Sequence, residues 1–229
     1  MPVPKTVGRI ERKFVKEQLY TTLRTWIVDG TLKPDEKVRD VDLAARFGVS
    51  RMPVREAFQR LEEDGLVQTA PNRWTRVSPL NLDDAMRIYP IVSTLEAFAL
   101  RSAGPRASEI DLTKLTDANQ QLARTLKTRN AAKATEADRD FHFALVRPAG
   151  NPELTAILDQ LRVKLRRIEI AYFDRCALAD RSVEEHLAII RALQKGDIDA
   201  AVGAVATNWH NGLTRLLGAQ TAPAKEQQG

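Results

Sequence analysis

Two short helical segments joined by a tight turn constrain the fold of this chain more than any other feature of its sequence. The first segment runs from Asp40 to Phe47 and is followed by Gly48, a residue that readily adopts the left-handed conformation that ends a helix. We expect Asp40 to cap the first helix and Ser50 to cap the second, because both side chains can accept hydrogen bonds from free backbone N–H groups. Pro53 falls in the first turn of the second helix, where its missing N–H removes no intrahelical bond. The two helices are therefore predicted to meet at a sharp turn.

The flanking residues add one helix before this pair and a β-hairpin after it. Between residues 9 and 28 the apolar residues recur with a period of roughly 3.6, which is typical of a helix. Short runs at residues 66–69 and 75–77 flank the turn Pro71-Asn72-Arg73 and predict two short strands. Three helices followed by a hairpin form a winged helix-turn-helix, which we predict for residues 1–78.

The rest of the chain has helical periodicity. We expect a linker at residues 79–82, an all-α domain at residues 83–218 and a disordered polar tail at residues 219–229. Breaks in the apolar pattern divide the second domain into about six helices, which we expect to form an antiparallel bundle. The predicted fold class is mainly α, with a small β-hairpin wing in the first domain.

Composition restricts the class of protein. No apolar run reaches the about 20 residues that span a bilayer, the N-terminus lacks the apolar core of a signal peptide, and the single cysteine excludes an internal disulfide. These features predict a cytoplasmic protein with no membrane partner. Residues 1–80 hold 15 of the 35 Lys and Arg residues but only 11 of the 30 Asp and Glu residues, so most of the net charge of +5 lies there. This asymmetry is compatible with a polyanionic partner.

The third predicted helix has an apolar face and a polar face. Its apolar stripe consists of Val54, Ala57, Phe58 and Leu61. A helix with a packed back and a polar front fits the major groove of double-stranded DNA. Arg51 and Arg55 lie in its first turn, where their planar guanidinium groups can pair with guanine O6 and N7 or bind phosphates.

The first domain resembles the GntR family of bacterial regulators. The resemblance rests on Leu32-Lys33-Pro34-Asp35, on Asp42-Leu43-Ala44, and above all on Gly48-Val49-Ser50-Arg51-Met52-Pro53-Val54-Arg55-Glu56-Ala57 followed by Leu61-Glu62-Glu63-Asp64-Gly65-Leu66-Val67. It implies that the third helix is the recognition helix, with Ser50, Arg51 and Arg55 at the DNA-contacting positions of the family. We add Met52 and Gln59, which lie on the same polar face, as candidate contacts to the operator.

The predicted wing resembles the Pro-Asn-Arg-Gly pattern of the same family, with Trp74 in place of the glycine. We expect Asn72 and Arg73 to contact DNA, because an extended basic tip can enter the narrow minor groove or bind a phosphate. The alternative is that Arg73 is a solvated residue of the turn.

All the histidines of the chain lie in the second domain, at positions 142, 186 and 210. Asp138 and His142 are four residues apart, which places a carboxylate and an imidazole on one helical face. His186 lies in an apolar stripe, where a lone histidine is more often a hydrogen-bonded core residue than a ligand. Both interpretations of His186 stay open at this point.

The second domain resembles the FCD domain, the effector-binding domain of the FadR subfamily, over roughly residues 82–217. The resemblance rests on Leu95-Glu96, Asp138-x-x-Phe141-His142, Gly150-Asn151-Pro152, Glu185-His186-x-x-Ile189 and Gly196-Asp197 followed by Ala200-Ala201. It implies a homodimer, and a divalent metal ion held by Asp138, His142, His186 and a fourth residue beside a small-molecule effector. Imidazole and oxygen ligands suit Zn, Ni or Mn, and we expect the effector to be an organic acid with a carboxylate group.

The fourth ligand is either Asn208 or His210. Counted from Gly196-Asp197, the last histidine of the family falls on Asn208, and His210 stands two residues later. At about 1.5 Å per residue, His186 lies about 15 Å from the turn near Gly196, Asn208 about 18 Å and His210 about 21 Å. Asn208 therefore lies closer than His210 to the level of His186 along the helix pair, and it is our preferred fourth ligand.

The sequence thus predicts a DNA-binding transcriptional repressor controlled by a metabolite, and not an enzyme. A metal-dependent enzyme could use an Asp/His cluster to activate water, but it would leave the N-terminal pattern without a purpose. A repressor in which the ion itself is the signal is the other alternative.

Overall fold

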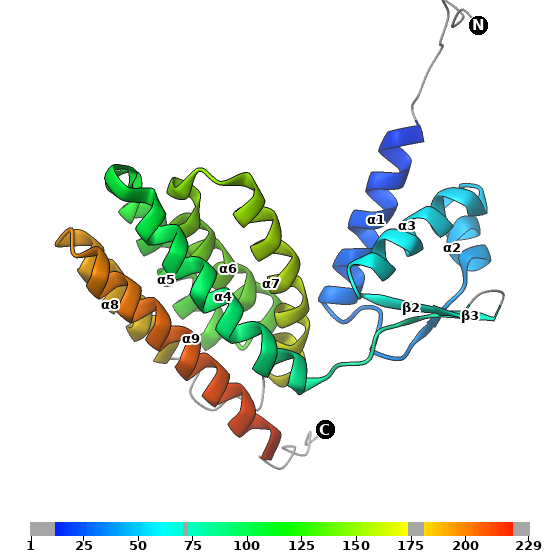
Figure 1. Cartoon of the computed structure of the whole chain (residues 1–229). Coiled ribbons are helices and arrows are strands. Elements are labelled where there is room, and N and C mark those ends of the chain that lie inside the picture. Colours follow the sequence, from blue (N-terminus) through cyan, green and yellow to red (C-terminus); the bar gives the residue numbers. More distant parts are fainter. Residues whose placement is uncertain (1–11, 71–72, 174–180, 222–229) are drawn as a thin grey trace, which may run out of the picture. The chain divides into compact units, whose positions relative to one another are not determined.

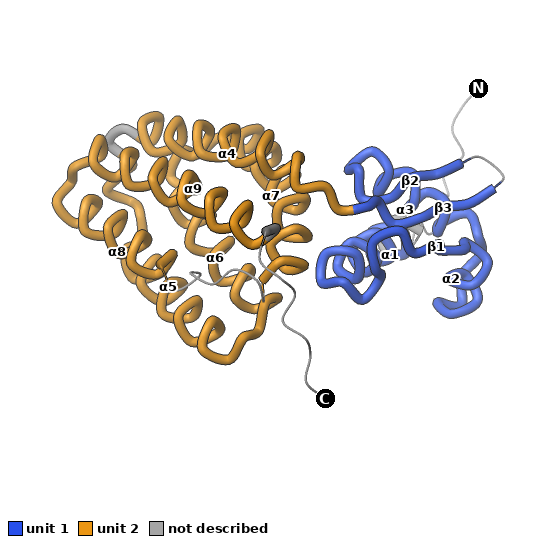
Figure 2. Tube along the Cα trace, turned by 90° about the horizontal axis from the view of Figure 1, so that it is seen from below, with its two compact units in different colours: residues 1–79 blue, residues 80–229 orange. Residues whose placement is uncertain are grey.

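The computed structural model describes residues 12–70, 73–173 and 181–221, which form helices and one small sheet (Figure 1). The chain divides into two compact units, Met1–Pro79 and Leu80–Gly229 (Figure 2). The boundary between them lies in the segment 79–82, where the sequence predicts a linker. The predicted mainly α fold with a small wing is confirmed.

The first unit combines three helices with a three-stranded antiparallel sheet of strand order β1-β3-β2. Its elements are α1 (Arg12–Val28), β1 (Lys37–Val38), α2 (Asp40–Phe47), α3 (Arg51–Glu63), β2 (Val67–Ala70) and β3 (Trp74–Val77). Strands β2 and β3 form the predicted wing, in a register that pairs Val67 with Val77 and Ala70 with Trp74. Strand β1 was not predicted, because two residues are too few to show an alternation of apolar and polar side chains.

The turn between α2 and α3 forms as the sequence predicts, with Gly48 at a left-handed φ of 66°. Ser50 occupies the N-cap position of α3 in an extended conformation, but its side chain makes no capping hydrogen bond within the described residues. The prediction that Asp40 caps α2 is wrong. Arg39 occupies the N-cap position and Asp40 is the first helical residue, because its carboxylate is bound by arginines of α3.

The apolar face of α3 is buried against the other helices of the first unit. The predicted stripe is confirmed, since Val54, Ala57, Phe58 and Leu61 are all buried. Leu23 of α1 is fully buried with them, and Trp26 of α1 stacks on Phe47 of α2 with ring centroids 5.5 Å apart. Each large apolar side chain buried in this way contributes about 1.5–3 kcal/mol. This core orients α3 so that its polar face is left to solvent.

The second unit contains six α-helices and two short 3-10 helices in the described residues. They are α4 (Leu82–Ala103), η1 (Gly104–Glu109), α5 (Leu112–Lys127), α6 (Ala131–Val146), η2 (Arg147–Ala149), α7 (Pro152–Tyr172), α8 (Arg181–Gln194) and α9 (Ile198–Thr221). Asp111, Asn130 and Asn151 cap α5, α6 and α7 through their side chains. Helix α9 continues to Thr221, although the sequence predicts that the domain ends at residue 218.

Helix α4 is the central element of the bundle. It packs against α6, α7 and α9, and α8 packs against both α5 and α9 (Figure 2). As a result, ten of the 22 residues of α4 are buried, among which Glu96 is the charged one and is fully inaccessible. Within the described residues, no helix has the length and apolarity needed to cross a membrane.

Candidate DNA-binding face and metal centre

The polar face of α3 and the base of the wing line one open groove of about 740 Å³ in the first unit. Arg51, Arg55 and Gln59 reach this groove from α3, and Arg73 reaches it from the residue before β3. All four side chains belong to exposed residues. Four of the residues predicted to contact DNA are therefore gathered on one accessible surface, whose lining also includes Arg39 and so carries four arginines.

Two further predicted contacts, Ser50 and Met52, are not part of the lining of this groove. Ser50 is exposed at the start of α3, and Met52 is exposed to 66% on the first turn of the same helix. Asn72 lies outside the described residues. Trp74, which replaces the glycine of the family pattern, lines the groove beside Arg73, and the guanidinium of Arg76 lies 4.8 Å from the centroid of its ring.

One carboxylate that the sequence analysis did not assign to the site lies between the two arginines of α3. Oδ2 of Asp40 is 2.6 Å from Nε of Arg55 and 3.0 Å from Nη2 of Arg51. Burial raises the pKa of Asp40, but hydrogen bonds from Arg55 and Arg51 outweigh this effect and lower the pKa below its ordinary value. The carboxylate is therefore ionised when the arginines are bound to it.

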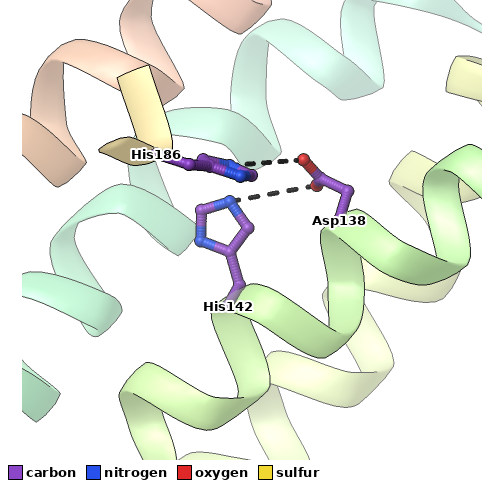
Figure 3. A group of neighbouring side chains, drawn as sticks. All are labelled: Asp138, His142 and His186. Carbon is purple, nitrogen blue, oxygen red and sulfur yellow. Dashed lines mark ion pairs between the residues drawn. The ribbon is translucent and has the colours of Figure 1, made fainter. Parts of the chain in front are cut away.

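In the second unit, Asp138 and His142 of α6 meet His186 of α8 (Figure 3). One ligand atom from each residue lies within 4.8 Å of the others. The carboxylate of Asp138 is 3.8 Å from Nε2 of His142 and 3.5 Å from Nε2 of His186. The two imidazoles are buried, with 2% and 0% of their surfaces exposed. The structure thus brings together the three residues whose ligand role the sequence predicts.

Hydrogen bonds on the opposite side of each imidazole determine which nitrogen faces the cluster. Nδ1 of His142 is 2.8 Å from Oε2 of Glu96, and Nδ1 of His186 is 3.1 Å from Oδ1 of Asn119. The amide of Asn119 is itself oriented, because its Nδ2 donates to the carbonyl of Val183. In the neutral tautomer that donates from Nδ1 to these oxygens, each imidazole presents a lone pair on Nε2.

These lone pairs give the cluster the donor set of a divalent metal site. Nε2 of His186 is buried and has no hydrogen-bond partner within the described residues. Leaving such an acceptor unsatisfied costs about 1–3 kcal/mol. An ion between Asp138 and the two Nε2 atoms would satisfy it, and the outer contacts from Glu96 and Asn119 are typical of metal-bound histidines. The residues present therefore fit a metal ion.

The charges around the cluster are set by burial and by two buried ion pairs. Burial raises the pKa of Glu96, but Arg162 and His142 outweigh it and lower the pKa to about 2. Glu96 also accepts a hydrogen bond of 2.8 Å from Nε1 of Trp209. Burial holds the pKa of His186 well below its ordinary value, so this imidazole is neutral and able to bind a metal.

A cavity of about 110 Å³ adjoins the cluster and offers space for a small ligand. Asn208 lines this cavity together with Asp138 and His142, whereas His210 is exposed. Nδ2 of Asn208 donates to Glu185 at 2.9 Å, which leaves Oδ1 as the atom of the amide that could act as a ligand. Of the two alternatives for the fourth ligand, only Asn208 lies at the cavity.

A second carboxylate, Glu169 of α7, also lines the cavity. Tyr89 donates to its Oε1 at 2.7 Å. Burial and the charge of Asp138 raise the pKa of Glu169 to about 7, against the opposing effect of the hydrogen bond from Tyr89. Sequence reasoning missed Glu169 and Asn119, because their roles depend on contacts between helices that are distant in the chain. Glu96 did carry a signal, since it is a lone charge within the apolar stripe of α4.

The chain matches two protein families that together cover most of its length. Residues 15–77 match the bacterial regulatory proteins of the gntR family, and residues 87–210 match the FCD domain. This chain belongs to the GntR family. The GntR regulator is 31% identical to the HTH-type transcriptional regulator YdhC of Bacillus subtilis over 203 residues, which cover 87% of this chain and 89% of that protein.

Further relatives agree with this assignment. The HTH-type transcriptional repressor RspR of Escherichia coli is 29% identical over 186 residues, covering 81% of this chain and 82% of that protein. The crystal structure of a GntR-type regulator from Rhodococcus sp. RHA1 superposes with a TM-score of 0.77 at 25% identity, covering 89% of this chain and 98% of the other. The predicted family and FCD architecture are confirmed. The protein is a DNA-binding transcriptional regulator and not an enzyme.

Proposed function

We propose that this GntR regulator is a cytoplasmic repressor that binds a double-stranded operator as a homodimer and is controlled by a small organic acid. The acid occupies the cavity of the second unit beside a divalent metal ion. The observation that carries the sensing part is the meeting of Asp138, His142 and His186 at the edge of a cavity, where the buried Nε2 of His186 has no hydrogen-bond partner among the described residues. A relative of similar architecture is named a transcriptional repressor, which supports the repressing role.

For DNA binding, the groove between α3 and the wing supplies the contacts. Arg55 and Gln59 would read base edges in the major groove, and Arg73 would reach the minor groove or a phosphate; their common position in this groove supports these roles. Ser50, Arg51, Met52 and Asn72 complete the proposed contact set. If Arg55 reads bases, the protein must prefer one sequence over random DNA. The phosphate contacts of the same groove should make this binding sensitive to salt.

In the second unit, Asp138, His142, His186 and Asn208 would hold the ion. Two imidazoles and two oxygens suit Zn, Ni or Mn. The bound ion would supply a positive charge inside the bundle. Asp138 is the anionic ligand, and Glu96 and Asn119 hold the imidazoles in the orientation that binding needs.

The charge distribution of the cavity favours a carboxylate that binds through the ion. Arg215 lines the cavity, but its guanidinium donates to both carboxylate oxygens of Glu185 and to Ser182. Its charge is therefore balanced by Glu185. An ion at Asp138 would be the cation best placed for an incoming organic acid.

The exposed surface of the second unit supports a homodimer. Ile91 and Phe98 of α4 are 47% and 51% exposed, and they lie seven residues apart on one helical face. Ile157 of α7, the neighbour of α4, is 48% exposed. Large contiguous apolar patches mark protein interfaces, and the spacing of Ile91 and Phe98 would place them in one such patch. Since regulators of this family typically dimerise, we propose that a second copy covers this face.

Three measurements test these proposals. Wild-type protein should retain one genomic fragment in preference to random DNA, with an affinity that falls as salt is raised; no preference would refute operator binding. Native mass spectrometry of the purified protein should show a dimer with a bound ion. Small carboxylic acids, titrated against their amides as controls, should bind with different affinity in the presence and absence of operator, and equal affinities would exclude coupling.

The alternative in which the ion is the signal has the same structural support from the metal cluster. It predicts that a chelator releases the protein from DNA without any organic ligand. Retention of DNA after complete removal of the ion would exclude it.

A further inference from the structure

We propose that Asp40 is a positioning residue that sets the base discrimination of the recognition helix by holding Arg51 and Arg55. Asp40 belongs to α2, outside the recognition helix, and is not among the residues assigned to DNA contact above. Its role rests on the DNA-binding function proposed for the groove of the first unit.

One carboxylate holds two guanidinium groups at the start of α3. The side chain of Asp40 is 18% exposed, while those of Arg51 and Arg55 are 55% and 60% exposed. Oδ2 accepts hydrogen bonds from Nε of Arg55 at 2.6 Å and from Nε and Nη2 of Arg51 at 3.2 Å and 3.0 Å, and Oδ1 accepts from Nη2 of Arg51 at 3.2 Å. Asp40 is thus the less mobile partner, and the arginines extend from it toward solvent.

The two arginines differ in what the carboxylate leaves available. Arg55 is bound through Nε, so its two Nη groups are left at the outer end of the guanidinium, where they match O6 and N7 of a guanine. Arg51 donates to the carboxylate from both Nε and Nη2. Of its guanidinium nitrogens, only Nη1 therefore makes no hydrogen bond to Asp40. The geometry assigns base reading to Arg55 and phosphate contact to Arg51.

Asp40 has one effect on discrimination and another on overall affinity. Holding Arg55 before DNA arrives removes part of the entropy cost of fixing a long side chain, and this helps only where the fixed position meets the correct base. This effect widens the difference between operator and random DNA. A carboxylate close to the DNA surface also repels phosphates, which weakens binding to every sequence and leaves that difference unchanged.

Asp42 provides a matched control on the same helix. Its side chain is 66% exposed and lies 3.7 Å from Arg39, a residue outside α3. Replacing Asp42 by asparagine removes the same charge as replacing Asp40, without touching the arginines of the recognition helix. Any difference between the two variants therefore reports the contact with Arg51 and Arg55 and not the change in net charge.

The test uses fluorescence anisotropy on the intact wild-type chain, Asp40→Asn and Asp42→Asn. The probes are the fragment that the wild type selects, variants of it with one base pair replaced at a time, and random DNA. Both variants should bind random DNA more tightly than the wild type, to a similar degree. Arg55→Ala identifies the base pair whose replacement no longer changes affinity. At this base pair, the affinity ratio between the selected fragment and its variant should fall by about five-fold or more in Asp40→Asn, whereas Asp42→Asn should keep the ratio of the wild type.

Asp40→Glu keeps the charge on a longer side chain and should recover part of the discrimination, which a purely structural role would not produce. Thermal unfolding of each variant confirms that it is folded. The role of Asp40 would be overturned if Asp40→Asn had the same affinity ratios between the selected fragment and its variants as Asp42→Asn. It would also be overturned if these ratios were larger than those of the wild type. A wild type without sequence preference would instead refute the proposed groove.

Discussion

The imidazole of His186 lies parallel to the ring of Phe141, with an interplanar angle of 2° and ring centroids 3.8 Å apart. Phe141 is fully buried in α6, next to His142, so one helix supplies both a histidine of the cluster and the surface on which the other histidine rests. Together with the hydrogen bond to Asn119, this stacking leaves the ring of His186 little freedom to rotate. The cluster is therefore held in place before any ion binds, which is the condition for a selective site.

We expect His186→Gln to abolish binding of divalent ions, because it removes one imidazole from the cluster. Asn208→Ala should weaken binding by a smaller factor, since an amide oxygen is the weaker ligand. Isothermal titration with Zn and with Ni on the purified protein measures both effects. His210→Gln is the control and should bind as the wild type does, because His210 is exposed. Loss of binding in the control with retention in Asn208→Ala would make His210 the fourth ligand instead.

Glu96→Gln should lower both the stability of the protein and its affinity for metal. The substitution leaves Arg162 buried without its carboxylate, and breaking a buried pair in this way costs about 3–5 kcal/mol. It also weakens the acceptor of Nδ1 of His142, an outer contact whose loss lowers metal affinity by about 10–100-fold. Urea unfolding and metal titration measure the two effects. The double variant Glu96→Gln with Arg162→Met should recover part of the stability, and a failure to do so would contradict the assigned pairing.

Tyr20 gives a prediction about alkaline pH. Its hydroxyl donates to Oδ2 of Asp64 at 2.6 Å, and burial followed by this hydrogen bond raises the pKa of Tyr20 to about 12. A raised pKa stabilises the folded state below the ordinary value of 10.0, and this contribution disappears as pH rises toward 12. The stability difference between the wild type and Tyr20→Phe should therefore be constant up to pH 10 and shrink above it. Urea unfolding across this range tests the expectation, and a difference that persists unchanged would refute it.

Arg55→Ala and Arg73→Ala should weaken DNA binding in different ways. For Arg55→Ala we expect a loss of about 1–3 kcal/mol on the operator and a flattened preference among operator variants. For Arg73→Ala we expect a uniform loss across sequences and a salt slope smaller by about 1, as for a phosphate contact. Anisotropy titrations at several salt concentrations separate the two. An unchanged isotherm for Arg55→Ala would remove this residue from the site.

Phe98→Asp should dissociate the proposed dimer, because it places a charge on the helical face of α4 that exposes Ile91 and Phe98. Light scattering coupled to size-exclusion chromatography reports the mass directly. Phe143→Asp is a matched control, since Phe143 is 48% exposed but lies on α6. Dissociation by both variants, or by the control alone, would place the interface elsewhere.

Much of this fold could be predicted from the sequence because its elements follow local rules. The period of the apolar residues predicts α3, and the left-handed preference of glycine predicts the stop at Gly48. The capping preference of aspartate failed at Asp40, because arginines of another helix compete for the same carboxylate. A preference measured on isolated helices cannot include a partner that only the tertiary structure brings close.

The candidate metal site could be predicted only in part for the same reason. The spacing of Asp138 and His142 puts them on one face of α6, and this face could be recognised from the sequence. Asn208 and His210 flank one apolar stripe, so the period of the apolar residues does not distinguish them. In the folded bundle Asn208 is buried and His210 is exposed. Asn119 had no signal at all, because its importance comes from a histidine 67 residues away.

Asn119 makes two hydrogen bonds that few other side chains could replace. Its amide accepts from the ring of His186 and donates to the carbonyl of Val183, and no other side chain of the same length and shape offers both functions. Aspartate would keep the first contact and lose the second, while leucine of similar volume would lose both. Almost any substitution of Asn119 therefore either frees the ring of His186 or takes the donor away from the carbonyl of Val183, although Asn119 lies outside the cluster itself.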